Sequence, residues 1–346
     1  MSLAPSPTAA RVADILDFLA SRPTESFTTS QLARAIDENR TTCQSVLLSL
    51  EAAGWVRRSA GKTYSLGSSA IVAGQAALAG LPFLDDLEHE LALLHREFGV
   101  EAVASVKTDD QMVVVARVGP DRTLVPSLHV GLTVPLVPPF GLAFVAWDDD
   151  AFDRWLRRGA DMLSSDDIDR LRRAAIVVRG LGYCVTLDRT SRARLADAIR
   201  DLDLAVRSPE ARARRDQLVD TLAHDEYVML DIEHQADQPV SQIAAPVFGT
   251  DQSVLATLSV MAFPNELIVE DMPRVAERLR TSAQAVTRRI NAPSGALSGS
   301  TALAPLPGGG TARRKIVARN ALTGSVSPRL GSTSRSNGAA QHKERK

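Results

Sequence analysis

The tripeptide Gly61-Lys62-Thr63 matches the end of the glycine-rich loop with which many proteins bind nucleotide phosphates. In that loop a glycine lies five residues before the Gly-Lys pair, so that backbone N–H groups can surround the phosphates. Val56 occupies this position, and the run after Thr63 alternates like a strand instead of starting a helix. The segment therefore predicts a hairpin over residues 55–65, with Arg57, Arg58 and Lys62 around its tip, and not a phosphate-binding loop.

A second group of polar side chains precedes this hairpin on an expected helix. The apolar side of that helix has residues at helical spacing, namely Cys43, Val46, Leu47 and Leu50. Its opposite side carries neutral hydrogen-bonding side chains near the N-terminus, where helix-turn-helix proteins read base edges in the major groove. Glutamine suits adenine, arginine suits guanine or phosphate, and a threonine methyl group can meet that of thymine. The predicted DNA contacts on this helix are Arg40, Thr41, Thr42, Gln44 and Ser45.

The basic hairpin then fits the role of a wing that touches backbone phosphates or the neighbouring minor groove. Taken alone, the polar helix side would be better interpreted as a solvated surface, and the three basic side chains as ordinary surface charge. Their combination on consecutive elements favours DNA binding.

The elements that would position these side chains form a winged helix-turn-helix domain over residues 8–68. The first helix has Val12, Ile15, Leu16 and Leu19 on one side and ends before Pro23. Thr28 or Thr29 offers an N-cap to a second helix, and Gly54 ends the third. Residues 69–80 are expected to form a linker helix.

Residues 81–291 are expected to form a second, α+β domain around an antiparallel sheet. Strands are predicted at residues 101–106, 112–118, 182–187, 227–232, 241–248 and 254–262, and helices at 148–158, 166–179 and 271–290. Residues 1–7 and 292–346 lack apolar periodicity and are expected to be disordered.

Composition agrees with two domains, since 346 residues with 45% hydrophobic side chains can bury two cores. The formal net charge is −1, but residues 292–346 hold nine basic side chains against Glu344 alone. That tail could be a nonspecific DNA arm or a solvated extension without a role. Two cysteines frame no disulfide or metal site, and the N-terminus lacks a signal peptide, so a cytoplasmic protein without membrane segments is expected.

Several stretches resemble the transcriptional regulators of the IclR family. In the first domain these are FTTSQLARAI, LLSLEAAGWVRR and YSLG; in the second they are GLTVPLVPPFGLAFVAW, RGLGYCVTLD and IAAPVFGTDQSVLATLSV. The resemblance covers about residues 8–290. It implies a GAF-like effector-binding domain, a small organic effector such as an organic or aromatic acid, and a homodimer or homotetramer on a near-palindromic operator in double-stranded DNA.

The resemblance also implies the residues of the effector pocket. Carried over by position, they are Phe140, Gly141, Asp231, Gln242 and Ser259. Residues 189–225 look like an insertion relative to the family, which leaves the position of Asp231 open by a residue or two. Pro138, Pro139 and Phe140 replace the family's smaller and more polar residues, which favours a tighter or more apolar pocket.

Two rival functions remain at this point. One is an enzyme domain carrying a DNA-binding head, against which stands the lack of a nucleophile elbow or a set of metal ligands. His89 and His95, for example, do not share a helix face. The other is a constitutive DNA-binding oligomer whose pocket is filled by its own side chains. The sequence favours a regulator with no catalytic residues, no metal and no cofactor.

Overall fold

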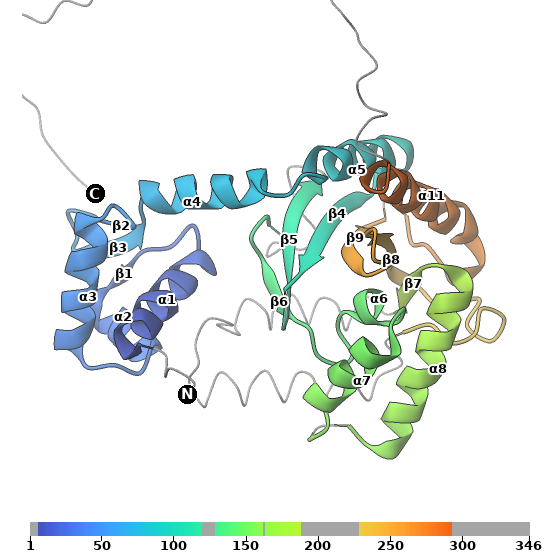
Figure 1. Ribbon diagram of the computed structural model, residues 1–346, viewed down its shortest axis with the longest axis horizontal. Coiled ribbons are helices and arrows are strands. Elements are labelled where there is room, and N and C mark those ends of the chain that lie inside the picture. Colours follow the sequence, from blue (N-terminus) through green and yellow to red (C-terminus); the bar gives the residue numbers. More distant parts are fainter. Residues whose placement is uncertain are drawn as a thin grey trace, which may run out of the picture. The chain divides into compact units, whose positions relative to one another are not determined.

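The computed structural model describes residues 6–108, 110–119, 129–161, 163–187, 228–263 and 265–292 (Figure 1). The expected insertion at 189–225 and nearly all of the basic tail lie outside these residues. The α+β fold is confirmed, with a helix-turn-helix region first and an antiparallel sheet domain after it.

Three helices and a small sheet make up the N-terminal domain. Each helix begins at a side-chain cap, as the sequence predicts for the second: Ser6 accepts the N–H of Ala9, Asn39 that of Thr42, and Thr28 forms a capping box with Gln31. The helices are α1 (Pro7–Ala20), α2 (Thr29–Ala35) and α3 (Arg40–Ala52). The strands β1 (Phe27–Thr28), β2 (Val56–Arg58) and β3 (Thr63–Leu66) pair antiparallel in the order β1-β3-β2.

The root of the hairpin depends on two glycines in close contact. Gly54 ends the α3 segment with φ +73°, a backbone conformation that favours glycine. A Cβ on Gly67 would lie 2.2 Å from the carbonyl oxygen of Gly54, so only glycine fits there. The N–H of Gly67 donates to the carbonyl of Trp55 at 2.7 Å, which closes the hairpin. The β2–β3 hairpin, called the wing below, thus has a fixed base.

Helix α4 (Ser68–Ala79) follows the wing and is apolar without being buried. None of its residues, all of which the structure describes, is buried, and Ile71 and Val72 are each 68% exposed. The side chain of Ser69 donates to the carbonyl of Ala53 at 2.9 Å and ties the start of the helix to the N-terminal domain.

A six-stranded antiparallel sheet forms the centre of the second domain, in the order β6-β5-β4-β9-β8-β7. The strands are β4 (Glu101–Lys107), β5 (Gln111–Val118), β6 (Thr133–Pro135), β7 (Cys184–Leu187), β8 (Val240–Phe248) and β9 (Val254–Met261). The strands predicted at 101–106 and 112–118 pair antiparallel as β4 and β5, and those predicted at 241–248 and 254–262 pair antiparallel as β8 and β9. Strand β6 was not predicted, because three residues ending in a proline give no periodic signal.

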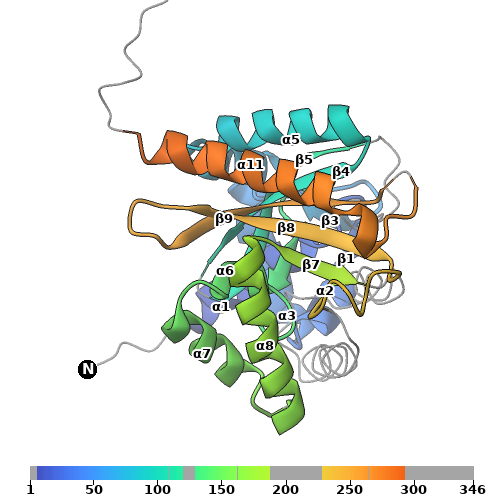
Figure 2. The same cartoon turned by 90° about the vertical axis from the view of Figure 1, so that its right-hand side faces the viewer.

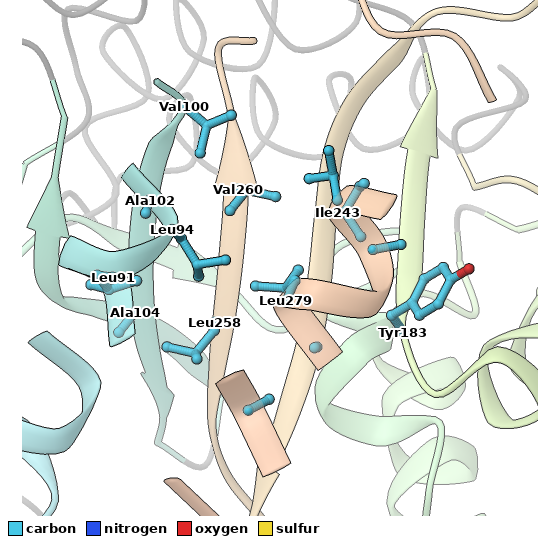
Figure 3. Close-up of a cluster of buried hydrophobic side chains, with 14 of the residues drawn as sticks. Leu91, Leu94, Val100, Ala102, Ala104, Tyr183, Ile243, Leu258, Val260 and Leu279 are labelled. Carbon is cyan, nitrogen blue, oxygen red and sulfur yellow. The ribbon is translucent and has the colours of Figure 1, made fainter. Parts of the chain in front are cut away.

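Helices cover both faces of this sheet (Figure 2). On one face lie α5 (Leu84–Phe98) and α11 (Pro273–Ile290), the latter preceded by the 3-10 turn η1 (Val269–Asp271). On the other lie α6 (Leu142–Val145), α7 (Asp149–Arg158) and α8 (Ser165–Leu181). Figure 3 shows the first of these interfaces, where leucines of both helices meet the strands. The labelled members are Leu91, Leu94, Val100, Ala102, Ala104, Tyr183, Ile243, Leu258, Val260 and Leu279.

A buried acid also joins α5 to α11. Glu90 on α5 is only 4% exposed, and both of its carboxylate oxygens have partners on α11. Ser282 donates to one oxygen at 2.8 Å, and Nη2 of Arg289 donates to the other at 3.3 Å. A second arginine, Arg278, donates a hydrogen bond to the hydroxyl oxygen of the same serine and another to Glu97 at 3.1 Å. Because a buried carboxylate without partners would be costly, these contacts stabilise the pairing of the two helices.

The prediction of a strand at residues 227–232 is wrong. Within the described residues it is reduced to a single bridge between Val228 and Thr186. The side-chain oxygen of Gln235 accepts the backbone N–H groups of Leu230 and Asp231, at 2.9 and 3.1 Å. These donors are therefore not available to a strand partner, and a turn forms instead.

Candidate nucleic-acid interface and effector site

Helix α3 has the two-sided character that the sequence predicts. Cys43, Val46, Leu47 and Leu50 are buried, whereas Arg40, Thr41 and Ser45 are exposed and Thr42 and Gln44 are half-buried. The side-chain oxygen of Asn39 accepts the N–H of Thr42 at 2.8 Å and sets the start of the helix. The positive end of the helix dipole is thus exposed beside Arg40, an arrangement that suits a phosphate.

Gln44 has an intramolecular partner that the sequence does not reveal. The hydroxyl of Thr29, the first residue of α2, donates to Oε1 of Gln44 at 3.3 Å. One residue earlier on α3, the thiol of buried Cys43 lies 3.8 Å from the carbonyl oxygen of Thr29. The start of α2 therefore positions both the buried and the outward side of α3.

Leu48 extends the outward side of α3 and was missed by the sequence analysis. It is 51% exposed and lies four residues after Gln44 and three after Ser45, on the same side of the helix. The helical spacing itself was the available signal, since Leu48 does not fit the buried series of Leu47 and Leu50.

The wing carries three exposed cations on a rigid surface. Nε of Arg57 donates to Oγ of Ser65 at 2.9 Å, and the guanidinium of Arg58 lies 5.8 Å from the ring centre of Tyr64. Lys62 is the left-handed residue of the turn, with φ +59°. Within the described chain none of these three cations is paired with a carboxylate. Their charge is therefore available to an external anion.

At the expected effector site the backbone turns sharply into α6. Gly141 has φ +82°, and a Cβ there would lie 2.3 Å from Cδ1 of Leu136. The preceding residue, Phe140, is buried, and its carbonyl accepts the indole N–H of Trp155 at 2.8 Å. The turn is thus fixed by the glycine on one side and by an indole hydrogen bond on the other.

Gln242 and Ser259 lie on the sheet face that α6 covers. Gln242 pairs with Met261 across β8 and β9, and Ser259 lies two residues from Met261, so the side chains share a face. Ala244, the cross-strand partner of Ser259, packs in the same apolar cluster as Phe140. Neither the hydroxyl of Ser259 nor the amide of Gln242 makes a hydrogen bond within the described residues. We call Gln242 and Ser259, together with the neighbouring turn at Phe140 and Gly141, the sheet-face site.

Asp231 is not brought to this group. It is exposed, and its Oδ1 accepts the backbone N–H groups of Glu233 and His234 at 2.9 and 3.1 Å. Hydrogen bonds from the backbone and the imidazole of His234 hold the pKa of Asp231 below its usual range. Its carboxylate is therefore occupied in its own turn.

Two further properties of the chain bear on the class of protein. Among the described residues no group of three or more His, Cys, Asp or Glu side chains could hold a metal ion. In the same part of the chain no single helix is long and apolar enough to cross a membrane, and only the bent pair α4 and α5 passes that test together.

The sequence and the fold both match IclR proteins. Residues 8–60 match the IclR helix-turn-helix domain. An IclR transcriptional regulator from Alicyclobacillus acidocaldarius superimposes with a TM-score of 0.59 at 22% identity, over 83% of this chain and 100% of that one. HmgR from Pseudomonas aeruginosa gives a TM-score of 0.54 at 22% identity, over 82% and 99% of the two chains.

A third similar structure contains a small molecule. It is an IclR homologue from Microbacterium hydrocarbonoxydans in complex with 4-hydroxybenzoate, with a TM-score of 0.55 at 15% identity, over 82% of this chain and 98% of that one. No curated protein matches the sequence.

Proposed function

Because the chain carries an IclR helix-turn-helix domain and has the fold of IclR regulators, we propose that it is a transcriptional regulator whose second domain senses a small organic molecule. In this proposal residues 8–68 bind DNA, 69–80 form the linker and 81–291 bind the effector. Two copies would place their α3 helices in successive major grooves, about 34 Å or a multiple of it apart on a near-palindromic operator.

The DNA-binding part of this proposal rests on one observation, the joint presence of a polar α3 surface and a wing with unpaired cations. Arg40, Thr41, Gln44 and Ser45 would meet base edges or nearby phosphates, and Arg57, Arg58 and Lys62 would meet the backbone. In the described residues no wing cation is paired with a carboxylate, so each keeps its positive charge for a phosphate.

A homo-oligomer is supported by the exposed side chains of α4. A helix with Ile71 and Val72 each 68% exposed leaves apolar area in water. Pairing of α4 with the same helix of a second copy would bury that area at about 25 cal/mol per Å². It would also join two DNA-binding domains, as a palindromic operator needs.

The effector half rests on the sheet-face site. Uncommitted polar groups, Ser259 and Gln242, lie on the same face as the fixed turn at Phe140–Gly141, and a small ligand would satisfy them. The 4-hydroxybenzoate in the Microbacterium homologue supports an organic acid as the class of ligand. Asp231 would join this site only after its turn rearranged.

The filled-pocket alternative also has an observation in its favour. Phe140 is 5% exposed and belongs to the same buried cluster as Leu136 and Leu142, the first residue of α6, so apolar side chains occupy much of this region. A constitutive DNA-binding oligomer would keep this arrangement with any metabolite. Effector binding would instead move Phe140.

Footprinting of the purified protein on its own promoter region, with and without pooled organic and aromatic acids, tests both halves. Protection of a near-palindrome that changes with one pool supports the proposal. Protection that no pool alters favours the constitutive oligomer. Absence of protection under all conditions rejects the regulator, and turnover of a pooled compound would point to the enzyme.

A further inference from the structure

A cavity of about 240 Å³ lies between α11 and the part of β8 that has no β7 partner. Strand β7 begins at Cys184, which pairs with Ala244, so β8 extends beyond it (Figure 2). Pro246 has no N–H, and the N–H of Phe248 donates to Oγ1 of Thr287 on α11 at 3.0 Å. The strand edge is thus satisfied without another strand, and the space beside it stays open. We call this space the α11 pocket.

One end of the α11 pocket is aromatic. Trp147, which follows α6, and Phe248 on β8 both line it, and their rings meet edge to face with centres 5.4 Å apart. The indole N–H of Trp147 donates to the carbonyl of Ala143 at 2.9 Å, which fixes the ring. A flat apolar body would find a preformed surface here.

The other end is basic. Arg280, Gln284 and Arg288 lie at four-residue intervals on the side of α11 that lines the pocket. Nε and Nη2 of Arg280 both donate to Glu277, at 3.1 and 2.6 Å, which balances its charge. The aliphatic part of the Arg280 side chain lies against Gly182, where an added Cβ would be 3.0 Å from Cδ of Arg280. Arg288 is exposed and has no ion-pair partner in the described chain, so the pocket keeps one positive charge in excess.

We propose that the α11 pocket binds a compact organic carboxylate with a flat apolar body, at a second small-molecule site separate from the sheet-face site. Arg288 and Gln284 donate to the carboxylate, and the hydroxyl hydrogen of Thr287 is free to do so because its oxygen is the atom that accepts from Phe248. The apolar body rests against Trp147 and Phe248. The cavity is smaller than the ~300–1,000 Å³ of drug-sized sites, which favours a ligand of one ring.

The tryptophans of this chain can distinguish the two sites. The chain has three: Trp147 lines the α11 pocket, Trp155 donates to Phe140 at the sheet-face site, and Trp55 belongs to the N-terminal domain. In full-length protein labelled with 5-fluorotryptophan, each gives its own 19F NMR signal. Replacing one tryptophan at a time by phenylalanine assigns the signals.

The experiment titrates the labelled protein with benzoate, with cyclohexanecarboxylate and with neutral benzamide. We expect saturable shifts of the Trp147 signal with benzoate, weaker ones with the non-planar cyclohexanecarboxylate, little change at Trp55, and no comparable shift with the amide. A shift of the Trp155 signal would report binding at the sheet-face site and does not enter this expectation. Arg288→Gln should raise the Kd at least about tenfold, the effect of losing charge-assisted hydrogen bonds. Arg157→Gln, which removes an exposed arginine of α7, should leave the Kd unchanged.

Three results would overturn the proposal. These are a saturable shift at Trp155 but not at Trp147, a Kd that Arg288→Gln does not alter, and no saturable shift of Trp147 with benzoate. Operator binding does not enter this test, so the α11 pocket and the proposed regulator function stand or fall separately.

Discussion

The hydroxyl of Thr29 at the start of α2 donates to Oε1 of Gln44 on α3, at 3.3 Å. The amide of Gln44 is therefore oriented before DNA arrives, which lowers the entropy lost when it meets a base. Thr29 is buried, so its role is to position Gln44 and not to touch DNA itself.

If Gln44 reads a base, Gln44→Ala should reduce discrimination at one operator position by about 1–3 kcal/mol. Thr29→Val keeps the shape of the side chain and removes the donor, so we expect a smaller loss of about 0.5–1.5 kcal/mol at the same position. Competition binding with single-base operator variants measures both. Unchanged base preferences in Gln44→Ala would show that Gln44 does not read a base.

The wing arginines should contribute to affinity without contributing to base preference. Removing two phosphate contacts by Arg57→Ala with Arg58→Ala should weaken binding to every sequence and reduce the salt slope by about 1.8. The matched control is Arg154→Ala with Arg157→Ala, two exposed arginines of α7. A change in preferred sequence at unchanged affinity would contradict the backbone role.

The α4 surface should decide the oligomeric state. Ile71→Lys with Val72→Lys should shift the protein toward monomers in sedimentation and lower its operator affinity, because lysines oppose burial of this surface. Ile176→Lys on α8 changes an equally exposed isoleucine, 67% against 68%, outside α4. If both variants stay oligomeric to the same extent, α4 is not the interface.

Gly141 should be the least replaceable of three glycines in the second domain. Gly141→Ala places a Cβ on a left-handed backbone, which costs about 1–2 kcal/mol of stability, and it also forces that Cβ against the side chain of Leu136. Gly131→Ala meets only the backbone term, since φ is +92° and no atom lies within 4 Å. Gly180→Ala in α8 meets neither and should stabilise by up to about 1 kcal/mol. Urea unfolding of the three variants should give this order.

Cysteine reactivity should report unfolding of each domain separately. Burial, aided by the charge of Glu38, raises the pKa of Cys43 from 9.0 to about 11, and burial raises that of Cys184 from 9.0 to about 12. Iodoacetamide at pH 8 should therefore modify neither thiol in the folded protein and both after denaturation. Labelling of Cys184 in folded protein would contradict its burial.

The same pKa shifts give a direction for the pH dependence of stability. The folded state holds the thiol protons more tightly than the unfolded state does. The contribution of the two protonated thiols to the stability of the fold is therefore complete below about pH 9. It is lost as the pH rises through 9 toward 11 and 12. Cys43→Ala and Cys184→Ala should each flatten the loss of stability in this range, as measured by urea unfolding.

Local patterns carried most of the fold prediction. The apolar spacing from Val12 to Leu19, the capping threonine at 28 and the stop at Gly54 are properties of short segments, and all three are confirmed. The strand predicted at 227–232 failed because Gln235, a polar residue outside the segment, takes its backbone donors.

The site was less accessible to prediction because it depends on contacts between distant segments. Gln44 was chosen from its place on α3, but its bond to Thr29 needs the packing of two helices. The α11 pocket joins Trp147, Phe248 and Arg288, which come from three segments spread over more than 140 residues, and no spacing along the chain marks it. Asp231 was placed by resemblance, and the turn that holds its carboxylate is formed by its own neighbours.

The edges of the six-stranded sheet restrict how copies of this protein can associate. Beyond the start of β7, the bond from Phe248 to Thr287 and the missing donor of Pro246 leave that part of β8 poor in donors for another chain. Along β7 the N–H of Met229 donates to Val185, and at the opposite edge β6 is three residues long and ends in Pro135. Strand addition, the common route to domain swapping and amyloid-like growth, is thereby disfavoured along these edges. Association through helix surfaces would leave the sheet of each copy closed, so copies that gather on DNA would be less prone to cross-β aggregation through these strands.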